Sequence, residues 1–296
     1  MSAHAPVLLD ETVAALAPRP GGVYCDCTLG RGGHARAILE AAGPDGRLIG
    51  IDRDPAALSE TEALLRPFGD QVRLVHGRFG DVKQHLDALG IGPLDGLCAD
   101  LGVSSPQLDR AERGFSFQKD GPLDMRMDPS RGPSAREAIH DLSERELADV
   151  IYELGEERRS RPIARAIKQR DAEGRLESTA DLRQAIVTAT GERRGPGIDP
   201  ATRTFQALRL YVNDELGELD RLLDALVDLL APGGVAAIIS FHSLEDRAVK
   251  RAFARDPRLV PLTKKPITAS DAECARNPRA RSAKLRAARR TSEARA

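Results

Sequence analysis

The segment with the clearest chemical potential is a glycine-rich turn, Asp26-Cys27-Thr28-Leu29-Gly30-Arg31-Gly32-Gly33-His34. An apolar stretch typical of a β-strand precedes it, and a helical stretch follows. Glycines let a backbone turn tightly and approach a ligand closely. The N-terminus of a helix adds unpaired N–H groups and positive potential. The turn therefore predicts a loop that binds the anionic group of a nucleotide-like ligand.

Three aspartates are expected at the same edge as this loop. Asp26 comes directly before it, Asp52 ends the next predicted strand, and Asp100 closes the fourth. An acid at the end of the second strand can accept hydrogen bonds from ribose hydroxyls. The spacing Gly30-x-Gly32-x-x-Ala35 also satisfies the dinucleotide fingerprint, so NAD fits the frame. Three carboxylates disfavour a pyrophosphate and favour the cationic donor S-adenosylmethionine. A glycine turn without any ligand is the remaining alternative.

Two further features have mainly structural interpretations. Phe79, after the third predicted strand, can pack against an adenine, but ordinary core packing is the better interpretation of it alone. The four cysteines, two of them two residues apart, are not completed by a second Cys or His pair. They predict reduced, buried thiols and no metal site. These cysteines are Cys25, Cys27, Cys98 and Cys274.

The elements that must position the loop alternate between strand and helix. The predicted strands are 23–27, 47–51, 71–76 and 94–101, and the predicted helices between the first three are 35–42 and 56–65. This alternation predicts an α/β fold with a mostly parallel sheet covered on both faces. Further on, apolar residues from Phe205 to Leu230 recur at three- and four-residue steps and predict one long helix. A buried strand over 235–241 and a helix over 245–254 follow, then a basic C-terminal tail.

Between these α/β parts lies a stretch of different character. A polar, loop-like segment over 109–133 is followed by helical patterns at 134–140, 144–152, 162–169 and 179–190. No buried strand is predicted there. The chain is therefore expected to consist of a first α/β part over 1–108, an inserted helical domain over 109–200, and a second α/β part over 201–296.

Composition and charge restrict the class of protein. The 296 residues are 41% hydrophobic and 30% charged, which is typical of a globular protein. No apolar run is long enough to span a membrane, and the N-terminus lacks a basic-then-apolar leader, so a cytoplasmic location is expected. From Arg247 onward, 15 Lys and Arg oppose 4 Asp and Glu, whereas the preceding residues hold 29 and 41. This asymmetry indicates either a polyanionic partner such as nucleic acid or a solvated tail.

At this level of detail the sequence resembles the bacterial 16S ribosomal RNA (cytosine-N4) methyltransferases. Nine blocks carry the resemblance and follow one another through nearly the whole chain. They are HAPVLLDE from His4, GRGGH from Gly30, IDRDP from Ile51, DLGVSSPQLD from Asp100, RGFSF from Arg113, GPLDMRMD from Gly121, ATRTFQALR from Ala201, SFHSLEDR from Ser240 and NPRARS from Asn277. The chain departs from the family pattern at Cys25, Cys27 and Ala35, and residues 257–274 are less similar.

The resemblance implies a class I, Rossmann-like methyltransferase fold with S-adenosylmethionine as donor. It implies that the acceptor is a cytidine in the decoding region of 16S rRNA within the small subunit, with no membrane partner and a homodimer as one candidate assembly. The family's donor contacts fall on Gly32, Gly33, His34, Asp52, Phe79, Asp100 and Gln107. The inserted domain is then expected to recognise RNA. Two other functions stay open on the residues alone: an NAD-dependent oxidoreductase and a non-catalytic RNA-binding assembly factor.

The catalytic step suggests a few further candidates. The exocyclic amine of cytosine is a poor nucleophile, so a nearby hydrogen-bond acceptor would assist it. Ser104, Ser105 and His242 are the candidates, each with an equally good structural interpretation. Mixed cations and aromatics suit a splayed base and its backbone; they are Arg110, Arg113, Phe115, Phe117, Arg126 and Arg131. Most phosphate contact is expected in the C-terminal part, from Arg276, Arg279, Arg281, Lys284, Arg286, Arg289 and Arg290.

Overall fold

The computed structural model describes residues 6–191, 197 and 199–292. His4 and Ala5 of the first family-like block therefore lie outside the described residues. The chain divides into two compact units: unit 1 comprises Met1–Gly102 and Leu216–Ala296, and unit 2 comprises Val103–Glu215. The insertion thus begins six residues before, and ends fifteen residues after, the span 109–200 expected from the sequence.

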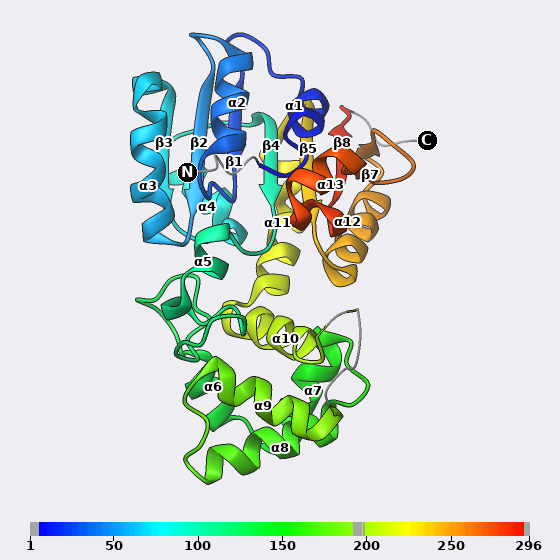
Figure 1. The fold of residues 1–296 in the computed structure, drawn as a ribbon. Coiled ribbons are helices and arrows are strands. Elements are labelled where there is room, and N and C mark those ends of the chain that lie inside the picture. The colour runs from blue at the N-terminus through cyan, green and yellow to red at the C-terminus, as the bar shows by residue number, and fades with distance from the viewer. Residues whose placement is uncertain (1–5, 192–196, 198, 293–296) are drawn as a thin grey trace. The chain divides into compact units, whose positions relative to one another are not determined.

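Unit 1 is built on one eight-stranded sheet with the order β3-β2-β1-β4-β5-β8-β6, and with β7 paired to β8 (Figure 1). The pairs among β1 to β5 are parallel, while β8 is antiparallel to β5, β6 and β7. The strands are β1 (Val23–Asp26), β2 (Arg47–Asp52), β3 (Val72–His76), β4 (Leu94–Asp100), β5 (Leu230–Ser240), β6 (Leu259–Pro261), β7 (Ile267–Thr268) and β8 (Lys284–Arg290). The α/β class and the mostly parallel sheet are as predicted.

Helices bury apolar side chains on both faces of this sheet. Alternate residues of β1 face opposite cores, Cys25 on one side and Tyr24 on the other, as the two-residue period of a strand requires. One face packs against α4 (Val82–Ala88), α11 (Glu215–Leu229) and α12 (Ser243–Arg255). The other packs against α1 (Leu9–Leu16) and α2 (Gly33–Ala42). The remaining helices of unit 1 are α3 (Pro55–Leu65) and α13 (Asp271–Arg276), with 3-10 turns at 66–71, 79–81 and 278–282.

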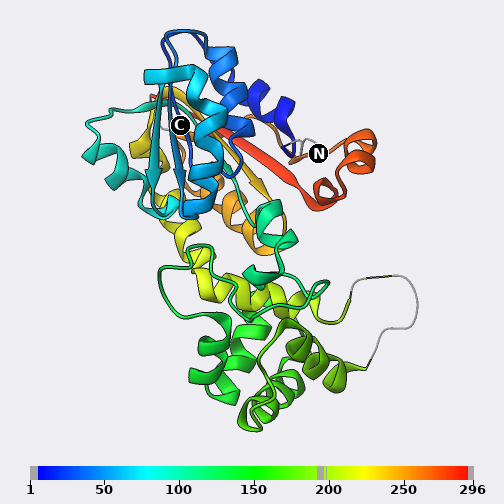
Figure 2. The same cartoon turned by 60° about the vertical axis from the view of Figure 1, so that its left-hand side comes forward.

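The basic C-terminal segment is a strand of the sheet, which corrects the expectation of a tail. β8 pairs with β5 from Val235↔Arg289 to Ser240↔Lys284, and Figure 2 shows it in red beside β5. Its apolar residues, Leu285 and Ala288, are fully buried. Four of its seven residues are basic and only Leu285, Ala287 and Ala288 are buried, so the hydrophobicity of the sequence does not indicate a strand there.

Unit 2 is helical around its own core. Its helices are α5 (Ser105–Asp109), α6 (Ala135–Asp141), α7 (Glu144–Gly155), α8 (Ser160–Ala172), α9 (Thr179–Thr190) and α10 (Thr202–Asn213), with a 3-10 turn at 111–113. Capping boxes begin α6, α7 and α9, where Ser134, Ser143 and Ser178 cap the first turns. Helices α6, α7, α8 and α9 agree within a few residues with the four helices predicted from the sequence.

The prediction of a single long helix over 205–230 is wrong. Asp214 adopts a left-handed conformation with φ 51°, which ends α10, and α11 begins at Glu215. Phe205 and Leu208 belong to the core of unit 2, whereas Leu219 and Leu226 belong to that of unit 1. One periodic stripe therefore serves two separate cores, and periodicity alone could not show the break.

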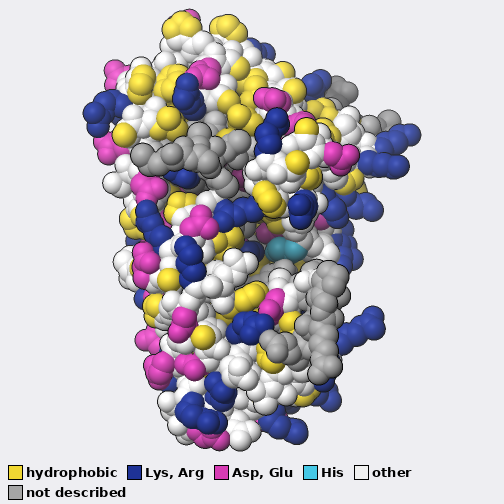
Figure 3. All heavy atoms as spheres, in the orientation of Figure 1, with side chains coloured by type: hydrophobic (Ala, Val, Ile, Leu, Met, Phe, Trp, Pro, Cys, Tyr) yellow, Lys and Arg dark blue, Asp and Glu magenta, His cyan; other side chains and the backbone are white. Residues whose placement is uncertain are grey.

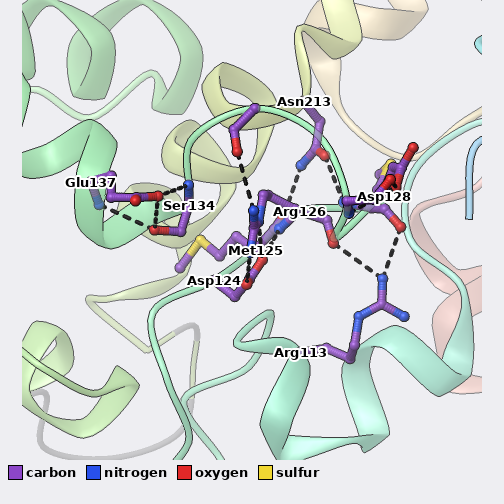
Figure 4. A network of polar contacts seen from close by, with 11 residues as sticks. Arg113, Asp124, Met125, Arg126, Asp128, Ser134, Glu137 and Asn213 are labelled. Atoms are coloured by element: carbon purple, nitrogen blue, oxygen red, sulfur yellow. Dashed lines mark hydrogen bonds and ion pairs between the residues drawn. The ribbon is translucent and has the colours of Figure 1, made fainter.

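A buried amide organises the loop from Asp124 to Asp128 in unit 2 (Figure 4). The Asn213 Nδ2 atom donates to the Met125 carbonyl at 2.7 Å, and the Asn213 Oδ1 atom accepts from the Met127 N–H at 2.8 Å. Arg113 donates to the carbonyls of Arg126 and Met127 at 3.1 and 2.9 Å. Met125 itself has φ 60°, a costly conformation for a non-glycine residue. The surrounding hydrogen bonds hold the loop in this strained form.

We expect Asn213→Ala to lower the free energy of unfolding of unit 2 by about 2–4 kcal/mol, because two buried backbone groups lose their partners. Urea unfolding followed by circular dichroism measures the change. Arg145→Ala, at a side chain that is 92% exposed, is the matched control and should be close to neutral. An Asn213→Ala midpoint equal to that of the control would contradict the role assigned to the amide.

No helix among the described residues is long and apolar enough to cross a membrane.

Candidate donor site of unit 1

The glycine loop turns tightly between β1 and α2, and steric crowding there leaves no room for larger residues at two of its glycines. Gly32 precedes α2 with φ 73°, and a Cβ atom placed there would meet the Thr61 side chain at 2.4 Å. A Cβ atom at Gly33 would lie 2.2 Å from the Pro6 ring. The predicted donor contacts Gly32 and Gly33 are therefore positions where the backbone packs too closely for any side chain.

The three aspartates of the predicted site lie at the ends of β1, β2 and β4, and each is tied to the loop. Asp26 Oδ1 accepts from the Thr28 N–H at 3.2 Å, and Asp52 Oδ2 accepts from the Gly30 N–H at 2.8 Å. The Asp100 N–H donates to the Thr28 hydroxyl at 2.6 Å. Thr28 thus links β1 to β4, a role that sequence reasoning missed because a loop threonine has no distinctive spacing.

Burial raises the pKa of all three carboxyl groups. Desolvation raises the pKa of Asp26 to about 7 and that of Asp52 to about 6. The pKa of Asp100 is raised well above its ordinary value by burial, then by the charges of Asp26 and Glu245. Clustered, desolvated carboxylates are stabilised by a cation, so the site favours a positively charged ligand.

His34 has a structural role for its side chain. The ring is 6% exposed, and Nε2 lies 3.1 Å from the Val7 carbonyl, to which it donates. Burial lowers the pKa of His34 to about 4, so the imidazole is neutral at physiological pH. The ring fixes the segment before α1 against α2. A donor contact from His34 would therefore come from its backbone at the start of α2.

Phe79 lies in the turn after β3, half-buried, and packs at the margin of the core that faces α11. Gln107, Ser104 and Ser105 belong to unit 2. Gln107 and Ser104 form the capping box of α5: the Gln107 side chain accepts from the Ser104 N–H at 2.9 Å. Both side chains thus have a local structural role, and Ser105 is buried beside them.

His242 follows β5 and caps the N-terminus of α12, and its ring contacts Glu245. Its Nδ1 atom accepts from the Glu245 N–H at 3.5 Å, and its Nε2 atom lies 3.1 Å from Glu245 Oε1. The nearby Glu245 carboxylate is buried and also accepts from the Phe241 N–H at 2.8 Å. Capping of α12 therefore accounts for Nδ1, whereas Nε2 is buried and has no hydrogen-bond partner among the described residues. The predicted role of His242 in proton transfer stays a prediction.

The residues singled out for a splayed base are mainly structural. Phe115 is 7% exposed, and Phe117 packs edge-to-face on Phe205 at 5.0 Å between ring centroids. The Arg126 guanidinium forms two hydrogen bonds with Asp124, at 2.9 and 2.6 Å. These side chains build the core and loop of unit 2, and Phe117 and Arg126 keep only part of their surface exposed. Arg131, in contrast, is 71% exposed.

The basic C-terminal residues are likewise divided between structure and surface. Arg286 and Lys284 of β8 approach Asp246 of α12 at 2.7 and 3.4 Å. Arg289 is exposed, as are Arg276 and Arg281 before β8. Figure 3 shows Lys and Arg side chains intermingled with Asp and Glu over the face in view. Because β8 is part of the sheet, phosphate contact by these residues has to be tested with single substitutions of the exposed arginines.

The cysteines show no sign of cross-linking. Cys25, Cys27, Cys98 and Cys274 are free thiols, and the Cys25 and Cys27 sulfurs are 3.7 Å apart. Within the described residues, no group of three or more His, Cys, Asp or Glu side chains is placed to hold a metal ion.

The residues fit S-adenosylmethionine. Asp100 Oδ1 is buried and has no hydrogen-bond partner within 6–191, 197 and 199–292, so an acceptor is available for a ligand. The loop brings backbone N–H groups at the start of α2 to the same edge, and these can receive the ligand's carboxylate. The sheet order β3-β2-β1-β4-β5-β8-β6, with β8 antiparallel, is doubly wound, and such sheets bind ligands at the carboxyl ends of their strands. Fold and site together define a methyltransferase that uses S-adenosylmethionine.

The comparisons with known proteins specify this class further. Residues 1–291 match the model of the MraW methylase family, and the chain belongs to that family. It is 58% identical to the "Ribosomal RNA small subunit methyltransferase H" of Sorangium cellulosum, over 99% of this chain and 92% of the relative. It is 51% identical to the protein of the same name from Geobacter sulfurreducens, over 96% and 98%. A solved O-methyltransferase from Thermotoga maritima is 9% identical with TM-score 0.47, covering 100% of this chain and 70% of that one. The family sets aside the NAD alternative.

We expect Asp26→Asn to stabilise the ligand-free protein increasingly as pH rises. A carboxyl group with a raised pKa contributes stability that is present below pH 4 and lost as pH rises through about 7. The neutral amide does not incur that loss, so the difference in unfolding free energy should grow by roughly 2–3 kcal/mol between pH 5 and pH 8. Thermal melts of the ligand-free variant and wild type at the two pH values measure it. A difference that is constant with pH would refute the buried, protonated state of Asp26.

Proposed function

We propose that this enzyme transfers the methyl group of S-adenosylmethionine to the exocyclic N4 amine of a cytidine in the decoding region of 16S rRNA, within the small ribosomal subunit. The observation that supports it most is full-length similarity to relatives named ribosomal RNA small subunit methyltransferase H, at up to 58% identity. The sequence blocks that resemble the cytosine-N4 family, from Asp100 to Asp109 for example, favour the cytidine amine as acceptor.

S-adenosylmethionine supplies an electrophilic methyl group on a positively charged sulfur. The residues of unit 1 contribute by holding that donor in one orientation. The backbone N–H of Gly33 would receive its carboxylate, Asp52 its ribose hydroxyls, and Phe79 its adenine. The Gly32 N–H already donates to the Leu29 carbonyl at 2.7 Å, so Gly32 would contribute through close approach of its backbone. Asp26 and Asp100 place negative charge close to its cations. Alignment of two reactants in this way can lower a barrier by roughly 7–11 kcal/mol in favourable cases.

The acceptor amine loses a proton when it is methylated, and a nearby acceptor would assist it. We retain Ser104, Ser105 and His242 as the candidates, and we add the open carboxylate oxygen of Asp100. Single-turnover methyl transfer to reconstituted small subunits tests the first three as alanine variants. Rates within a few-fold of wild type for all three would remove them from the mechanism and leave Asp100.

We propose unit 2 as the domain that recognises RNA. A base must leave its stack before its amine can meet the donor, and such recognition uses exposed cations and polar groups around the extruded nucleotide. Exposed Arg131 of unit 2 is one such cation, and exposed Arg276, Arg281 and Arg289 of unit 1 are others. Reversal of these charges should weaken RNA binding and reduce its salt dependence.

Mapping of modified nucleotides in 16S rRNA tests the proposal. Cells that lack this protein should lose one N4-methyl group from a decoding-region cytidine, and the wild-type gene should restore it. The gene for the Asp52→Ala variant should not restore this methyl group. Loss of a methyl group from another base, or from none, would show that the acceptor has been assigned wrongly.

The location and assembly of the enzyme are also part of this proposal. We propose that it acts in the cytoplasm, where its substrate would be found, and that it forms a homodimer. Light scattering at micromolar concentration measures the mass directly, and a value near 32 kDa would exclude the dimer.

A further inference from the structure

A buried carboxylate contacts the arginines that adjoin Asp52 and Phe79 of the predicted adenosine site. Glu218, in the first turn of α11, is 0% exposed. Its Oε1 atom accepts from Arg53 Nη1 at 2.8 Å and lies 3.6 Å from Arg78 Nε. The Arg53 side chain is itself only 12% exposed. An ion pair shielded from water in this way is strongly coupled, because solvent does not screen it.

The two arginines belong to the two loops that the donor's nucleoside would contact. Arg53 follows Asp52 at the end of β2, and Arg78 precedes Phe79 at the end of β3. The two strand ends are also joined directly: the Gly77 N–H donates to the Asp52 carbonyl, and His76 Nε2 lies 3.0 Å from the Arg53 carbonyl. One carboxylate oxygen therefore connects both loops to α11.

The backbone confirms how closely α11 supports these loops. A Cβ atom at Gly80, in the turn after Phe79, would lie 3.0 Å from the Glu218 Cα atom and 3.1 Å from its carbonyl oxygen. The turn that carries Phe79 thus rests on the same helical residue whose side chain binds the arginines. A shift of Glu218 would therefore displace both loops.

The charge of Glu218 also affects how Arg53 interacts with Asp52. Arg53 and Asp52 are neighbours in the chain, and the positive charge of Arg53 acts on the Asp52 carboxyl group. Without the Glu218 carboxylate, the largely buried positive charge of Arg53 could move toward the Asp52 carboxylate, on which it already acts. An Arg53–Asp52 pair would occupy the oxygens that ribose hydroxyls need.

We propose that Glu218 is a positioning residue for the methyl donor, which holds Arg53 away from Asp52 and supports the Phe79 turn. The inference rests on the donor site described above. It adds a residue whose effect reaches the ligand through Arg53 and Arg78.

Calorimetric titration with S-adenosylhomocysteine tests the inference on four variants of the full chain. Glu218→Gln should weaken binding roughly tenfold, the effect of losing one strong hydrogen bond to a charged group. Arg53→Met should change it by less than about threefold, because Asp52 keeps its own contacts. The double variant Glu218→Gln, Arg53→Met should bind like Arg53→Met alone. Asp220→Asn, an exposed acid on the same helix, is the matched control and should bind like wild type.

Recovery of affinity in the double variant is the decisive result. If Glu218 had a role in packing alone, the double variant would bind S-adenosylhomocysteine at least as weakly as Glu218→Gln. A rise in the KM for the donor with kcat preserved at saturating donor would agree with it. If Glu218→Gln does not fold, Glu218→Asp replaces it, with an expected loss of about threefold to tenfold that Arg53→Met again relieves.

Unchanged affinity in Glu218→Gln, or no relief in the double variant, would overturn the inference while the donor site stands. Failure of the wild-type protein to bind S-adenosylhomocysteine would remove the donor site and this inference together.

Discussion

Replacement of Asp52 by alanine is expected to weaken binding of S-adenosylhomocysteine by about 100-fold, the loss of two hydrogen bonds to a charged acceptor. The carboxylate has two roles at the end of β2. It accepts from the Gly30 N–H at 2.8 Å, which fixes the glycine loop, and from the Asp54 N–H at 2.8 Å. Its remaining lone pairs face the ribose in the proposed complex. The alanine variant loses the ligand contacts and the anchor of the loop at once.

Titration calorimetry measures this loss of affinity, and two further variants serve as comparisons. Asp52→Asn keeps one oxygen acceptor and should lose about tenfold. Asp45→Ala makes the same substitution at an exposed turn between α2 and β2 and should bind normally. Equal affinities for Asp52→Ala and Asp45→Ala would show that the nucleoside does not bind at the end of β2.

The affinity for S-adenosylmethionine is expected to fall about 100-fold between pH 7.5 and pH 5.5. Burial raises the pKa of Asp26 to about 7 and that of Asp52 to about 6, so both groups take up protons across this range. A cationic ligand prefers their charged forms. Binding therefore releases protons, and acidification opposes it. Titrations in two buffers of different ionisation enthalpy measure both the affinity and the number of protons released.

The Asp26→Asn variant separates the two groups in this pH dependence. With Asp26 unable to titrate, only Asp52 remains, and the decrease over the same range should shrink to about fourfold. Titration of the ligand's own amino group is common to both proteins and cancels in the comparison. Proton uptake on binding, or the same pH dependence in both proteins, would contradict the role of Asp26.

Much of the donor site was predictable from local sequence. The glycine loop between strand and helix, and Asp52 at the end of the next strand, are short-range patterns with few structural alternatives. Asp26 and Asp100 meet at one edge because parallel strands share their carboxyl ends, which follows from the strand–helix alternation. The family resemblance adds Phe79 and Gln107 as predicted donor contacts, which the residues alone favoured as core or left unassigned, and these two roles stay predictions.

The interpretations of surface residues were less successful. Phe115, Phe117 and Arg126 suggested a base-binding surface by type and proximity. In the structure the two rings pack in or against the interior of unit 2, and the guanidinium is held by Asp124. Residue type indicates what a side chain can bind, whereas burial and pairing decide whether it is available.

The α/β class, the glycine loop with its acids, the helices of the insertion and the family all follow from the residue pattern. The division of a continuous apolar stripe between two cores at Asp214, and the place of Lys284–Arg290 as a strand inside the sheet, became visible only in the folded chain. Only folding brings Glu218 to Arg53, 165 residues away in the chain. The physical reason is that periodicity and loop motifs depend on neighbours a few residues apart, whereas packing partners and buried ion pairs are chosen among residues that become close only when the chain has folded.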